Sequence, residues 1–394
     1  MYKIENIEEQ MSMVRILHIS NEDDSYGSAK CLQELLIEEL EDGEIKPIVI
    51  TPVRNKMNKF CDEYEIENYS CSYMSFMYMK HDNMATIKFV LRKIQYNILK
   101  IWAQKKIPRY VNMDLIDLIH TNNAAYDIGA ILALKYSIPH IWHLREGGLK
   151  HFNYVPYFNN AFAYMNSLSN CFIAVSEFVK EEWVKLGLDK DKIKVLYDGV
   201  NVRGSKLALN NNIYKIKIVM IGTIMEPKGQ KILVEALENL GNSYLDKVEV
   251  HFYGYEEGEY YNDIKRYIRE KKMENVVFFE GYSKDVWKEL LKYDMGVNCS
   301  KAEAFGRCTA EYLIAGLPVL AFDTGANSEL IGEYGVLCKN YNVASFSSKL
   351  KYMIDNIDDF RRKKEEIRNY GLEKFSIETN SFKIIECFKE RCIK

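Results

Sequence analysis

Short apolar runs alternate with helix-like stretches along almost the whole chain. In the first half, we predict strands at residues 14–19, 47–51, 117–120, 140–143, 171–175 and 193–197. A second series follows at residues 216–221, 248–253, 276–279, 295–299 and 318–322. Alternation of this kind is typical of βα units, so the pattern predicts an α/β protein with two Rossmann-like parallel sheets. Neither series has G-x-G-x-x-G after its first strand, which argues against a dinucleotide site.

A polar break between the two series marks the predicted domain boundary. After Asn201 the chain turns polar through residues 210–212 before the next apolar run begins. A chain of 394 residues is also too long for one ordinary core. We therefore expect an amino-terminal domain at residues 1–205 and a carboxy-terminal domain at residues 206–375, followed by a segment of helical composition.

The bulk composition narrows the class of protein. An apolar fraction of 47% supports an ordered soluble protein, and a net charge of -3 argues against generic nucleic-acid binding. The nine cysteines are scattered without a C-x-x-C pair, which fits reduced thiols better than disulfides or a zinc site. The first ten residues are acidic and polar, and no apolar stretch reaches the length of a membrane span. We therefore expect a cytoplasmic protein without a secretory signal.

Two glutamates, Glu303 and Glu311, stand eight positions apart between the predicted strands at 295–299 and 318–322. Ligands bind beyond the carboxyl ends of parallel strands, and a helix N-terminus suits an anion. Glu303 lies in the loop after the first strand, and Glu311 lies about one turn inside the following helix, predicted at 309–315. The spacing alone is typical of surface carboxylates. The Phe-Gly pair before the helix and the G-L-P-V turn after it favour a binding site.

At this motif the sequence resembles the retaining glycosyltransferases of family 4, which carry E-x7-E followed by a G-x-P-V turn. The resemblance covers the carboxy-terminal half and, more weakly, the amino-terminal half. It implies the GT-B fold, in which two Rossmann-like domains face each other across a cleft. It also implies a last helix, about residues 376–394, that packs back on the first domain. The implied reaction transfers a sugar from a nucleotide-diphospho-sugar with retention of configuration, without a metal or another cofactor.

The resemblance assigns donor-binding roles around the two glutamates. Glu303 would accept hydrogen bonds from hydroxyls of the donor sugar, and Glu311 from the ribose hydroxyls. Carboxylates suit both roles because each accepts two donors at once. Backbone N–H groups around Phe305, Gly306 and Cys308 would face the sugar and the phosphates.

A lysine after the first strand of the second domain, Lys228, is the predicted diphosphate contact, because a cation there neutralises phosphate charge. An ordinary surface lysine is the alternative. Many family members have an arginine where Thr223 stands, so either the Thr223 hydroxyl or Arg307 would supply the second contact. The turn at Tyr282 corresponds to the nucleobase position, with a plain strand-end turn as the alternative. The loop 323–329 would pack near the nucleotide.

The first domain supplies further candidates. Gly27 resembles a glycine whose backbone meets the diphosphate, with a tight turn as the equal alternative. His143 corresponds to a family histidine close to the transferred sugar, although a lone histidine is more often structural. Arg145 and Glu146 would contact the acceptor or phosphate, and His120 is a weaker candidate.

The leading interpretation is a retaining glycosyltransferase that uses a UDP-sugar in surface-glycan synthesis, with a glycan or lipid-linked acceptor. No D-x-D follows a strand end, and the acidic residues 21–24 are interpreted as an exposed loop, so no metal site is predicted. The alternatives are a nucleotide-sugar epimerase or hydrolase of the same fold, or a non-catalytic partner subunit.

A helix predicted at 84–106 carries two different faces. We interpret one stripe as its core face, formed by Met84, Ile87, Val90, Leu91, Ile94, Ile98, Ile101 and Trp102. The opposite surface mixes cations with apolar residues: Lys88, Arg92, Lys93 and Lys100 with Phe89, Tyr96 and Leu99. Such a mixture suits anionic lipid headgroups. We therefore expect residues 84–109 to dock peripherally at the inner face of a membrane.

Overall fold

The structure is a computed structural model that describes residues 13–20, 27–79, 86–151, 153–201, 215–283 and 285–392. The chain folds into two compact units. The first unit comprises residues 1–199 and 377–394, and the second comprises residues 200–376. Most of the predicted polar break, at residues 202–214, lies outside the described residues.

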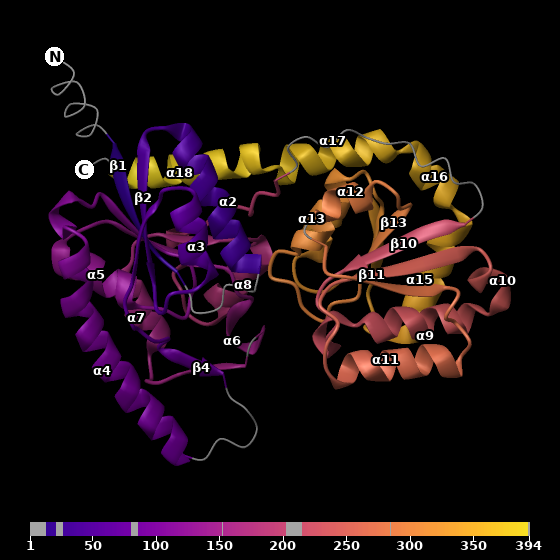
Figure 1. The fold of residues 1–394 in the computed structure, drawn as a ribbon, viewed down its shortest axis with the longest axis horizontal. Coiled ribbons are helices and arrows are strands. Elements are labelled where there is room, and N and C mark those ends of the chain that lie inside the picture. The colour runs from indigo at the N-terminus through magenta and orange to yellow at the C-terminus, as the bar shows by residue number, and fades with distance from the viewer. Residues whose placement is uncertain are drawn as a thin grey trace. The chain divides into compact units, whose positions relative to one another are not determined.

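The first unit, which Figure 1 draws in indigo to magenta apart from its yellow last helix, is built on a seven-stranded parallel sheet. Its strand order is β3-β2-β1-β5-β6-β8-β9. The strands are β1 (Val14–Ile19), β2 (Ile45–Thr51), β3 (Glu67–Ser70), β5 (Leu118–Thr121), β6 (His140–Leu144), β8 (Phe172–Ala174) and β9 (Ile193–Val195). A separate antiparallel pair joins β4 (Met77–Met79) to β7 (Tyr154–Pro156). The six strands that we predicted are present within a few residues. The edge strand β3 was missed because its sequence, Glu-Asn-Tyr-Ser, is half-buried and has no apolar alternation.

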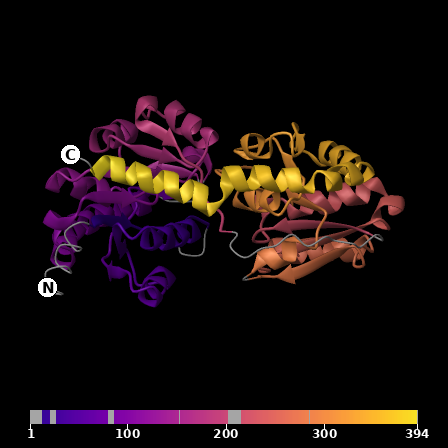
Figure 2. The same cartoon turned by 90° about the horizontal axis from the view of Figure 1, so that it is seen from above.

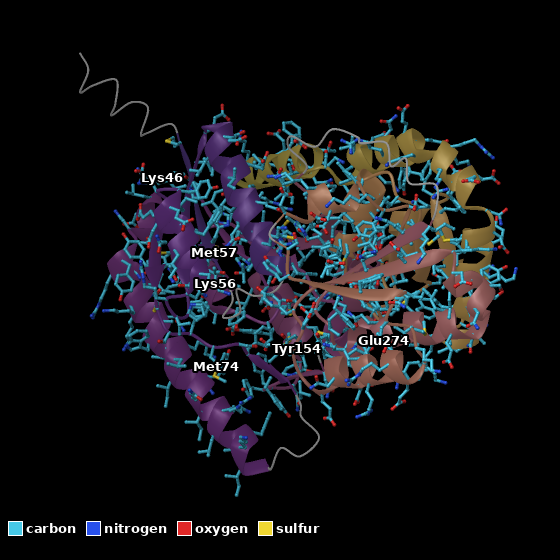
Figure 3. The ribbon with its side chains drawn as sticks, turned by 45° about the vertical axis from the view of Figure 1, so that its right-hand side comes forward. Lys46, Lys56, Met57, Met74, Tyr154 and Glu274 are labelled. Atoms are coloured by element: carbon cyan, nitrogen blue, oxygen red, sulfur yellow. The ribbon has the colours of Figure 1, made fainter. Side chains whose placement is uncertain are left out.

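Helices and short turns connect these strands. They are α2 (Gly27–Asp42), α3 (Lys56–Glu63), α4 (Thr86–Tyr110), α5 (Ile128–Tyr136), α6 (Gly148–His151), α7 (Ala161–Leu168), α8 (Glu177–Lys185) and α18 (Ile377–Cys392), with 3-10 turns η1 (Met113–Leu115) and η2 (Lys190–Lys192). Local sequence fixes several of their ends. Asn55 caps α3, and Ser176 caps α8 by accepting a bond from the Val179 amide. Figure 3 labels Lys56 and Met57 at the start of α3, where Met57 is fully buried.

The last helix, α18, belongs to the first unit although it follows the whole second unit in sequence. Its Ile384, Ile385 and Phe388 side chains share a buried cluster with Ile16 of β1 and Leu118 of β5. Figure 2 shows α18, in yellow, lying along the elements of this unit. Apolar burial of this kind stabilises the fold, so α18 is an integral layer of the first unit rather than an appendage.

The second unit is built on a six-stranded parallel sheet with the order β12-β11-β10-β13-β14-β15. The strands are β10 (Ile216–Ile221), β11 (Val248–Tyr253), β12 (Val277–Gly281), β13 (Met295–Asn298), β14 (Val319–Phe322) and β15 (Gly335–Cys338). Its helices are α9 (Gln230–Leu240), α10 (Asn242–Leu245), α11 (Glu259–Glu270), α12 (Val286–Leu290), α13 (Arg307–Ile314), α14 (Asn327–Ile331), α15 (Val343–Asp355), α16 (Ile357–Arg362) and α17 (Lys364–Phe375), with a 3-10 turn η3 (Glu226–Lys228). The predicted α/β architecture with two parallel sheets is confirmed.

Both sheets contain a point where the strand order reverses. In the second unit the chain runs outward from β10 through β11 to β12 and then returns to β13 on the other side of β10. In the first unit the same reversal falls between β1 and β5. The connections leave opposite faces of the sheet at such a point, which opens a crevice at the carboxyl ends of the strands. These two ends are therefore the natural positions for ligand sites.

The helix α4 corrects our interpretation of its apolar stripe. Seven of the eight residues that we interpreted as its core face are exposed, and the side chain of the eighth, Met84, lies outside the described residues. The buried face instead contains Tyr96, Ala103 and Ile107. Tyr96 holds this orientation by donating a hydrogen bond of 2.5 Å to Asp127. Periodicity locates an apolar face, but it does not tell which face of a helix the neighbouring elements cover.

Within the described part of the chain, no helix is both long enough and apolar enough to cross a membrane.

Candidate active site

The loops after β10 and β13 bring a cation and a carboxylate together at the reversal point of the second unit. Lys228, at the end of η3, places its Nζ 2.8 Å from Oε1 of Glu303, in the loop after β13. The Glu303 side chain is 11% exposed and the Lys228 side chain is 30% exposed. The sequence predicted both residues as donor contacts, and the structure places them in direct contact.

A glycine explains how the lysine reaches this position. Gly229 directly follows η3 and has a φ of +76°, in the left-handed region that favours glycine. A side chain at residue 229 would begin 2.5 Å from the carbonyl oxygen of Cys299, at the end of β13. Only glycine therefore allows the turn to pack against that strand end. This close packing brings Lys228 to the loop that carries Glu303.

The helix α13 carries the second glutamate. Gly306 caps α13 with a φ of +89°, so the chain turns sharply from the Glu303 loop into the helix. Glu311 lies one turn further along and accepts a bond of 3.1 Å from Nε of Arg307. Both side chains are largely buried. The predicted position of Glu311 inside the first helical turns is confirmed, and its pairing with Arg307 was not predicted.

The pKa values of Lys228 and Cys308 reflect the charged groups around them. Burial by itself lowers the pKa of Lys228, but the charge of Glu303 outweighs it and raises this pKa above its usual value. The thiol of Cys308 lies within electrostatic reach of Lys228, Glu303 and Glu311 at once. Burial raises the pKa of Cys308 to about 12, with Lys228 opposing this shift and both carboxylates adding to it. Near neutral pH, Lys228 is therefore positively charged and Cys308 is an uncharged thiol.

A buried polar network, which the sequence did not reveal, supports the loop and α13. The Asn298 amide donates to the hydroxyl of Thr309 at 3.0 Å, and this hydroxyl donates to Oδ1 of Asn327 at 3.2 Å. The backbone of Ala326 donates to the carbonyl of Glu303 at 2.9 Å. The predicted loop at 323–329 thus braces the Glu303 backbone. Fully satisfied buried networks of this kind fix one conformation.

Two exposed tyrosines form a flat surface at the ends of β11 and β12. The Tyr255 and Tyr282 rings stack with their centroids 4.7 Å apart and an angle of 9° between their planes. They are 49% and 58% exposed. The sequence indicated Tyr282 but not Tyr255, which no motif marks. An exposed aromatic pair at this edge of the sheet offers a face on which a planar base can stack.

Two other predicted donor contacts differ in their exposure. Thr223 is exposed in the loop after β10, and its carbonyl accepts a bond of 3.0 Å from Gln230. The Phe305 ring is only 5% exposed and packs edge-on against Phe375. Phe305 therefore anchors the loop with its side chain, and only its backbone stays a predicted ligand contact.

In the first unit, three histidines form a buried chain across the strands β1, β5 and β6. Nδ1 of His18 lies 2.9 Å from Nδ1 of His120, and Nε2 of His120 lies 3.2 Å from Nδ1 of His143. Nε2 of His18 lies 3.0 Å from a carboxylate oxygen of Glu39, although the angle at this ring nitrogen is outside hydrogen-bond geometry. All four side chains are fully buried. The sequence indicated His143 and His120 as candidates, but it did not predict the contact between them.

One end of this chain sets its hydrogen-bond direction. Arg145 lies 3.4 Å from Nδ1 of His143 and can only donate, so this nitrogen is an acceptor. Nε2 of His120 therefore donates to it, and Nδ1 of His120 accepts from Nδ1 of His18. Burial lowers the pKa of His120 and of His143 well below the usual value, so both rings are neutral. The geometry therefore predicts that His143 carries its proton on Nε2, which lacks a partner among the described residues.

The two residues beyond this strand, Arg145 and Glu146, are engaged within the first unit. Arg145 pairs with Asp198 and donates a bond of 2.8 Å to Asn122. Glu146 accepts from Asn123 and, at 3.3 Å, from the backbone of Ala124. Burial raises the pKa of Glu146 to about 7, although the bond from the Ala124 backbone and the charge of Arg145 oppose the shift. Both side chains are less than a tenth exposed, and their contact with an acceptor or phosphate stays a prediction.

The remaining first-unit candidate, Gly27, is the first residue of α2. Its φ is not in the left-handed region, and no described atom lies within 4 Å of where a Cβ would stand. Neither the backbone conformation of residue 27 nor the described atoms around it require a glycine. The structure therefore gives no support to the alternative that Gly27 serves a tight turn. Residues 21–26, including the acidic cluster and most of the predicted glycine loop, lie outside the described residues.

Two further features bear on the location of a site. A shallow hollow of about 620 Å³ lies at the amino ends of β2 and β3, whereas the reversal point lies at the carboxyl ends of β1 and β5. The hollow is therefore separate from the candidate site residues at the carboxyl ends of the strands. Among the residues that the structure describes, no three His, Cys, Asp or Glu side chains gather to hold a metal ion. The expected independence of metals and cofactors stays a prediction.

Two family models match the two halves of the chain. The model described as Glycosyltransferase Family 4 matches residues 36–203, and the model described as Glycosyl transferases group 1 matches residues 207–373. The chain is also similar to a poly(ribitol-phosphate) alpha-N-acetylglucosaminyltransferase of Staphylococcus aureus, with 30% identity over 135 residues. This alignment covers 34% of the chain but only 27% of that relative.

Solved structures share the fold over nearly the whole chain. HepE from Anabaena, in complex with UDP, superposes with a TM-score of 0.76 and 18% identity, covering 96% of this chain and all of that one. A variant of S. aureus TarM, in complex with fondaparinux, alpha-GlcNAc-glycerol and UDP, gives a TM-score of 0.72 and 14% identity, covering 95% of this chain and all of that one. At these identities the likeness concerns the fold alone.

Proposed function

We propose that this chain, which is a glycosyltransferase of family 4 with the GT-B fold, transfers a sugar from a UDP-sugar with retention of configuration. The contact of 2.8 Å between Lys228 and Glu303 at the reversal point of the second sheet carries the proposal. It joins the two charges that a nucleotide-sugar requires, a cation for the diphosphate and a carboxylate for the sugar hydroxyls. UDP is the proposed nucleotide because HepE and TarM were solved with it.

The charged pairs of the second unit suggest how the donor is held. Without donor, Lys228 pairs with Glu303 and Arg307 pairs with Glu311. A bound diphosphate supplies the cations with new anionic partners, and the carboxylates can then accept from the sugar and the ribose. The pairing keeps each buried charge compensated before the donor arrives, because an isolated buried charge is costly. The stacked pair of Tyr255 and Tyr282 would support the base.

The proposed transfer needs no carboxylate nucleophile. The bond between the anomeric carbon and the β-phosphate oxygen breaks, while the acceptor hydroxyl oxygen bonds to that carbon on the same face. The proton of this hydroxyl passes to the leaving phosphate oxygen, which acts as the base. Lys228 stabilises the charge that develops on the diphosphate, and stabilisation of this kind is often the largest contribution to the rate. From the first unit, His143 would donate from Nε2 to an oxygen of the bound sugar.

The proposed acceptor is a glycan or lipid-linked glycan of surface-polymer synthesis. The similarity to an enzyme named for poly(ribitol-phosphate) supports a polymer acceptor rich in hydroxyl and phosphate groups. The proposal includes a cytoplasmic location at the inner face of the membrane. Nine cysteines without a disulfide fit a reducing compartment.

Incubation with a panel of nucleotide-sugars, with release of the nucleotide as the readout, tests the proposal. Turnover with UDP-sugars, dependent on an added acceptor, supports it, and NMR of the product then gives the anomeric configuration. The Glu303→Ala variant is expected to bind UDP and to lose transfer. Nucleotide release at full rate without an acceptor would instead show a hydrolase, and a lack of thermal stabilisation by any nucleotide would show a non-catalytic subunit.

A further inference from the structure

The outer face of α4 is unusual for the surface of a folded unit. It presents a continuous apolar stripe, formed by Ile87, Val90, Leu91, Ile94, Ile98, Ile101 and Trp102. Ile87 is 73% exposed, Ile98 is 61% exposed and Trp102 is 44% exposed. Seven of the eighteen exposed large hydrophobic side chains among the described residues thus lie on this one helix. Contiguous exposed apolar surfaces of this kind mark interaction sites.

The stripe is long and straight because it follows the helical repeat. Its central members, Ile87, Leu91, Ile94 and Ile98, are spaced by four, three and four residues, which places them on one line along the helix. From Ile87 to Trp102 the line extends over about 22 Å, at about 1.5 Å per residue. Figure 1 shows α4 along the outside of the first unit, and Figure 3 shows side chains projecting from it over its whole length.

The other side of α4 fixes this orientation. Tyr96 is 2% exposed and donates its hydroxyl to Asp127, which also accepts a bond of 2.9 Å from Tyr164. Ala103 and Ile107 are fully buried on the same side. Rotation of the helix to bury the stripe would break these contacts. The stripe is therefore held outward by the fold of the unit.

Charge identifies the partner. The 25 residues of α4 include seven basic residues, Lys88, Arg92, Lys93, Lys100, Lys105, Lys106 and Arg109, and no acidic residue. The whole chain, by contrast, has a net charge of -3. A turn of about 100° per residue places Lys88 and Lys106 along one border of the stripe and Lys93 toward the other. Lys100 lies nearer the buried face, where it donates a bond of 3.2 Å to the Tyr96 hydroxyl. Lys105 and Arg109 continue the line of the stripe itself.

We propose that the outer face of α4 docks the first unit on an anionic lipid bilayer, with the helix lying in the plane of the interface. The apolar stripe enters the boundary between headgroups and acyl chains, and the flanking cations contact lipid phosphates. A second copy of this chain is the poorer partner, because two α4 faces would oppose seven cations with seven cations and would bring no acidic residue. The α4 surface is the only evidence that the docking proposal uses. The idea that docking brings the enzyme to an acceptor held in the membrane rests on the proposed function.

Vesicle flotation tests the proposal with the full chain. At low salt we expect binding to vesicles of phosphatidylglycerol and phosphatidylcholine, and little binding to phosphatidylcholine alone. High salt should weaken the binding strongly, because each cation near the surface contributes about a five-fold increase in partitioning. Binding to neither kind of vesicle, or equal binding to both at every salt concentration, would overturn the proposal.

Two double variants test the apolar stripe and the flanking lysines separately. Ile94→Gln with Ile98→Gln should reduce partitioning at least about ten-fold by removing the centre of the stripe. Lys88→Gln with Lys93→Gln should reduce it about twenty-five-fold, at five-fold for each charge. Leu134→Gln is the matched control, because Leu134 is a 64% exposed apolar residue of α5 in the same unit. All these side chains face solvent, so the variants should fold, and unchanged binding by both α4 variants would contradict the proposal.

The Trp102 fluorescence gives an independent measurement. Vesicles with brominated acyl chains should quench it, and Trp102→Phe should lose most of the quenching while it still floats with the vesicles. Quenching that persists in this variant would place another tryptophan at the membrane and overturn the assignment to α4. Light scattering detects a dimer. If Ile94→Gln with Ile98→Gln converted such a dimer to a monomer and the parent protein did not float with vesicles, a second copy would cover the stripe and the proposal would be wrong. If flotation succeeds but no UDP-sugar is turned over, the proposed function fails and docking stands.

Discussion

The two units share a parallel α/β topology with one reversal of strand order, but they place charge differently at the carboxyl ends of their strands. In the second unit, Lys228 pairs with Glu303 and remains 30% exposed. In the first unit, His143, Arg145 and Glu146 are buried and bonded to neighbouring polar groups. The second unit therefore offers charges that a ligand can take over. In the first unit, these three buried side chains are already hydrogen-bonded to protein groups before any ligand binds.

The largest expected effect lies in the second unit. Lys228→Met keeps the length of the side chain but removes the charge that would face the diphosphate, so we expect kcat/KM for the UDP-sugar to fall about 100- to 1000-fold. Steady-state release of UDP measures this change. Lys231→Met is the matched control, since Lys231 lies on the surface of α9 three residues further along. Similar activity of the two variants would remove Lys228 from the site.

The next effect concerns stability in the first unit and its dependence on pH. The Glu146 carboxyl has a raised pKa of about 7 in the folded protein and an ordinary pKa of 4.5 when unfolded. The folded state therefore holds this proton longer, and stability falls as the pH rises from about 4.5 to about 7, by up to about 3 kcal/mol. Glu146→Gln should remove this part of the pH dependence. Urea unfolding at several pH values gives the comparison.

The exposed Glu181 supplies the control for this titration. Its side chain is 68% exposed on α8 of the same unit, so Glu181→Gln should leave the pH profile as in the parent protein. Parallel stability curves for the parent protein and Glu146→Gln between pH 5 and pH 8 would show that burial does not shift this carboxyl.

A smaller effect is expected from the histidine chain. We expect nitrogen-15 NMR of the parent protein to show the His143 proton on Nε2. His120→Leu removes the neighbour that donates to Nδ1 of His143 and should lower kcat about five- to ten-fold, the usual contribution of one hydrogen bond. His120→Gln retains an N–H donor and should recover much of the activity. A proton found on Nδ1 of His143 in the parent protein would refute the predicted direction of the chain.

The smallest effect should come from the stacked tyrosines of the second unit. Tyr282→Ala removes one ring of the exposed pair, so we expect UDP to bind about five-fold more weakly. Tyr352→Ala is the matched control, because Tyr352 is 52% exposed on α15 and lies in no predicted site. Equal losses in the two variants would mean that Tyr282 does not contact the base.

The sequence predicted the fold well where strands are buried on both faces. Largely apolar runs located β1, β10 and β11 to the residue, since most of the positions in these strands are buried and the runs end where polar turns begin. The edge strand β3 was missed because its half-buried residues include no apolar run, and β15 was missed because its Gly-Val-Leu-Cys run is only four residues long.

The sequence predicted Lys228, Glu303 and Glu311 as contacts of one donor, but it gave the geometry only where one motif spans the site. Glu303 and Glu311 belong to a single loop-helix unit, so their sequence spacing carries their geometry. The His18–His120–His143 chain and the Tyr255–Tyr282 stack join residues from separate strands. Such contacts depend on strand order, which no local pattern encodes. The same limit explains the error at α4, whose covered face depends on Tyr96 meeting Asp127, 31 residues away.

Calorimetric titration of UDP into the parent protein and into Lys228→Met tests the diphosphate-binding role of the second unit most directly. We expect the parent protein to bind UDP and the variant to bind at least about ten-fold more weakly. The variant should also unfold at a lower temperature, because Glu303 loses its partner, so the titration is run well below that temperature. UDP binding of equal strength by both proteins would contradict the account.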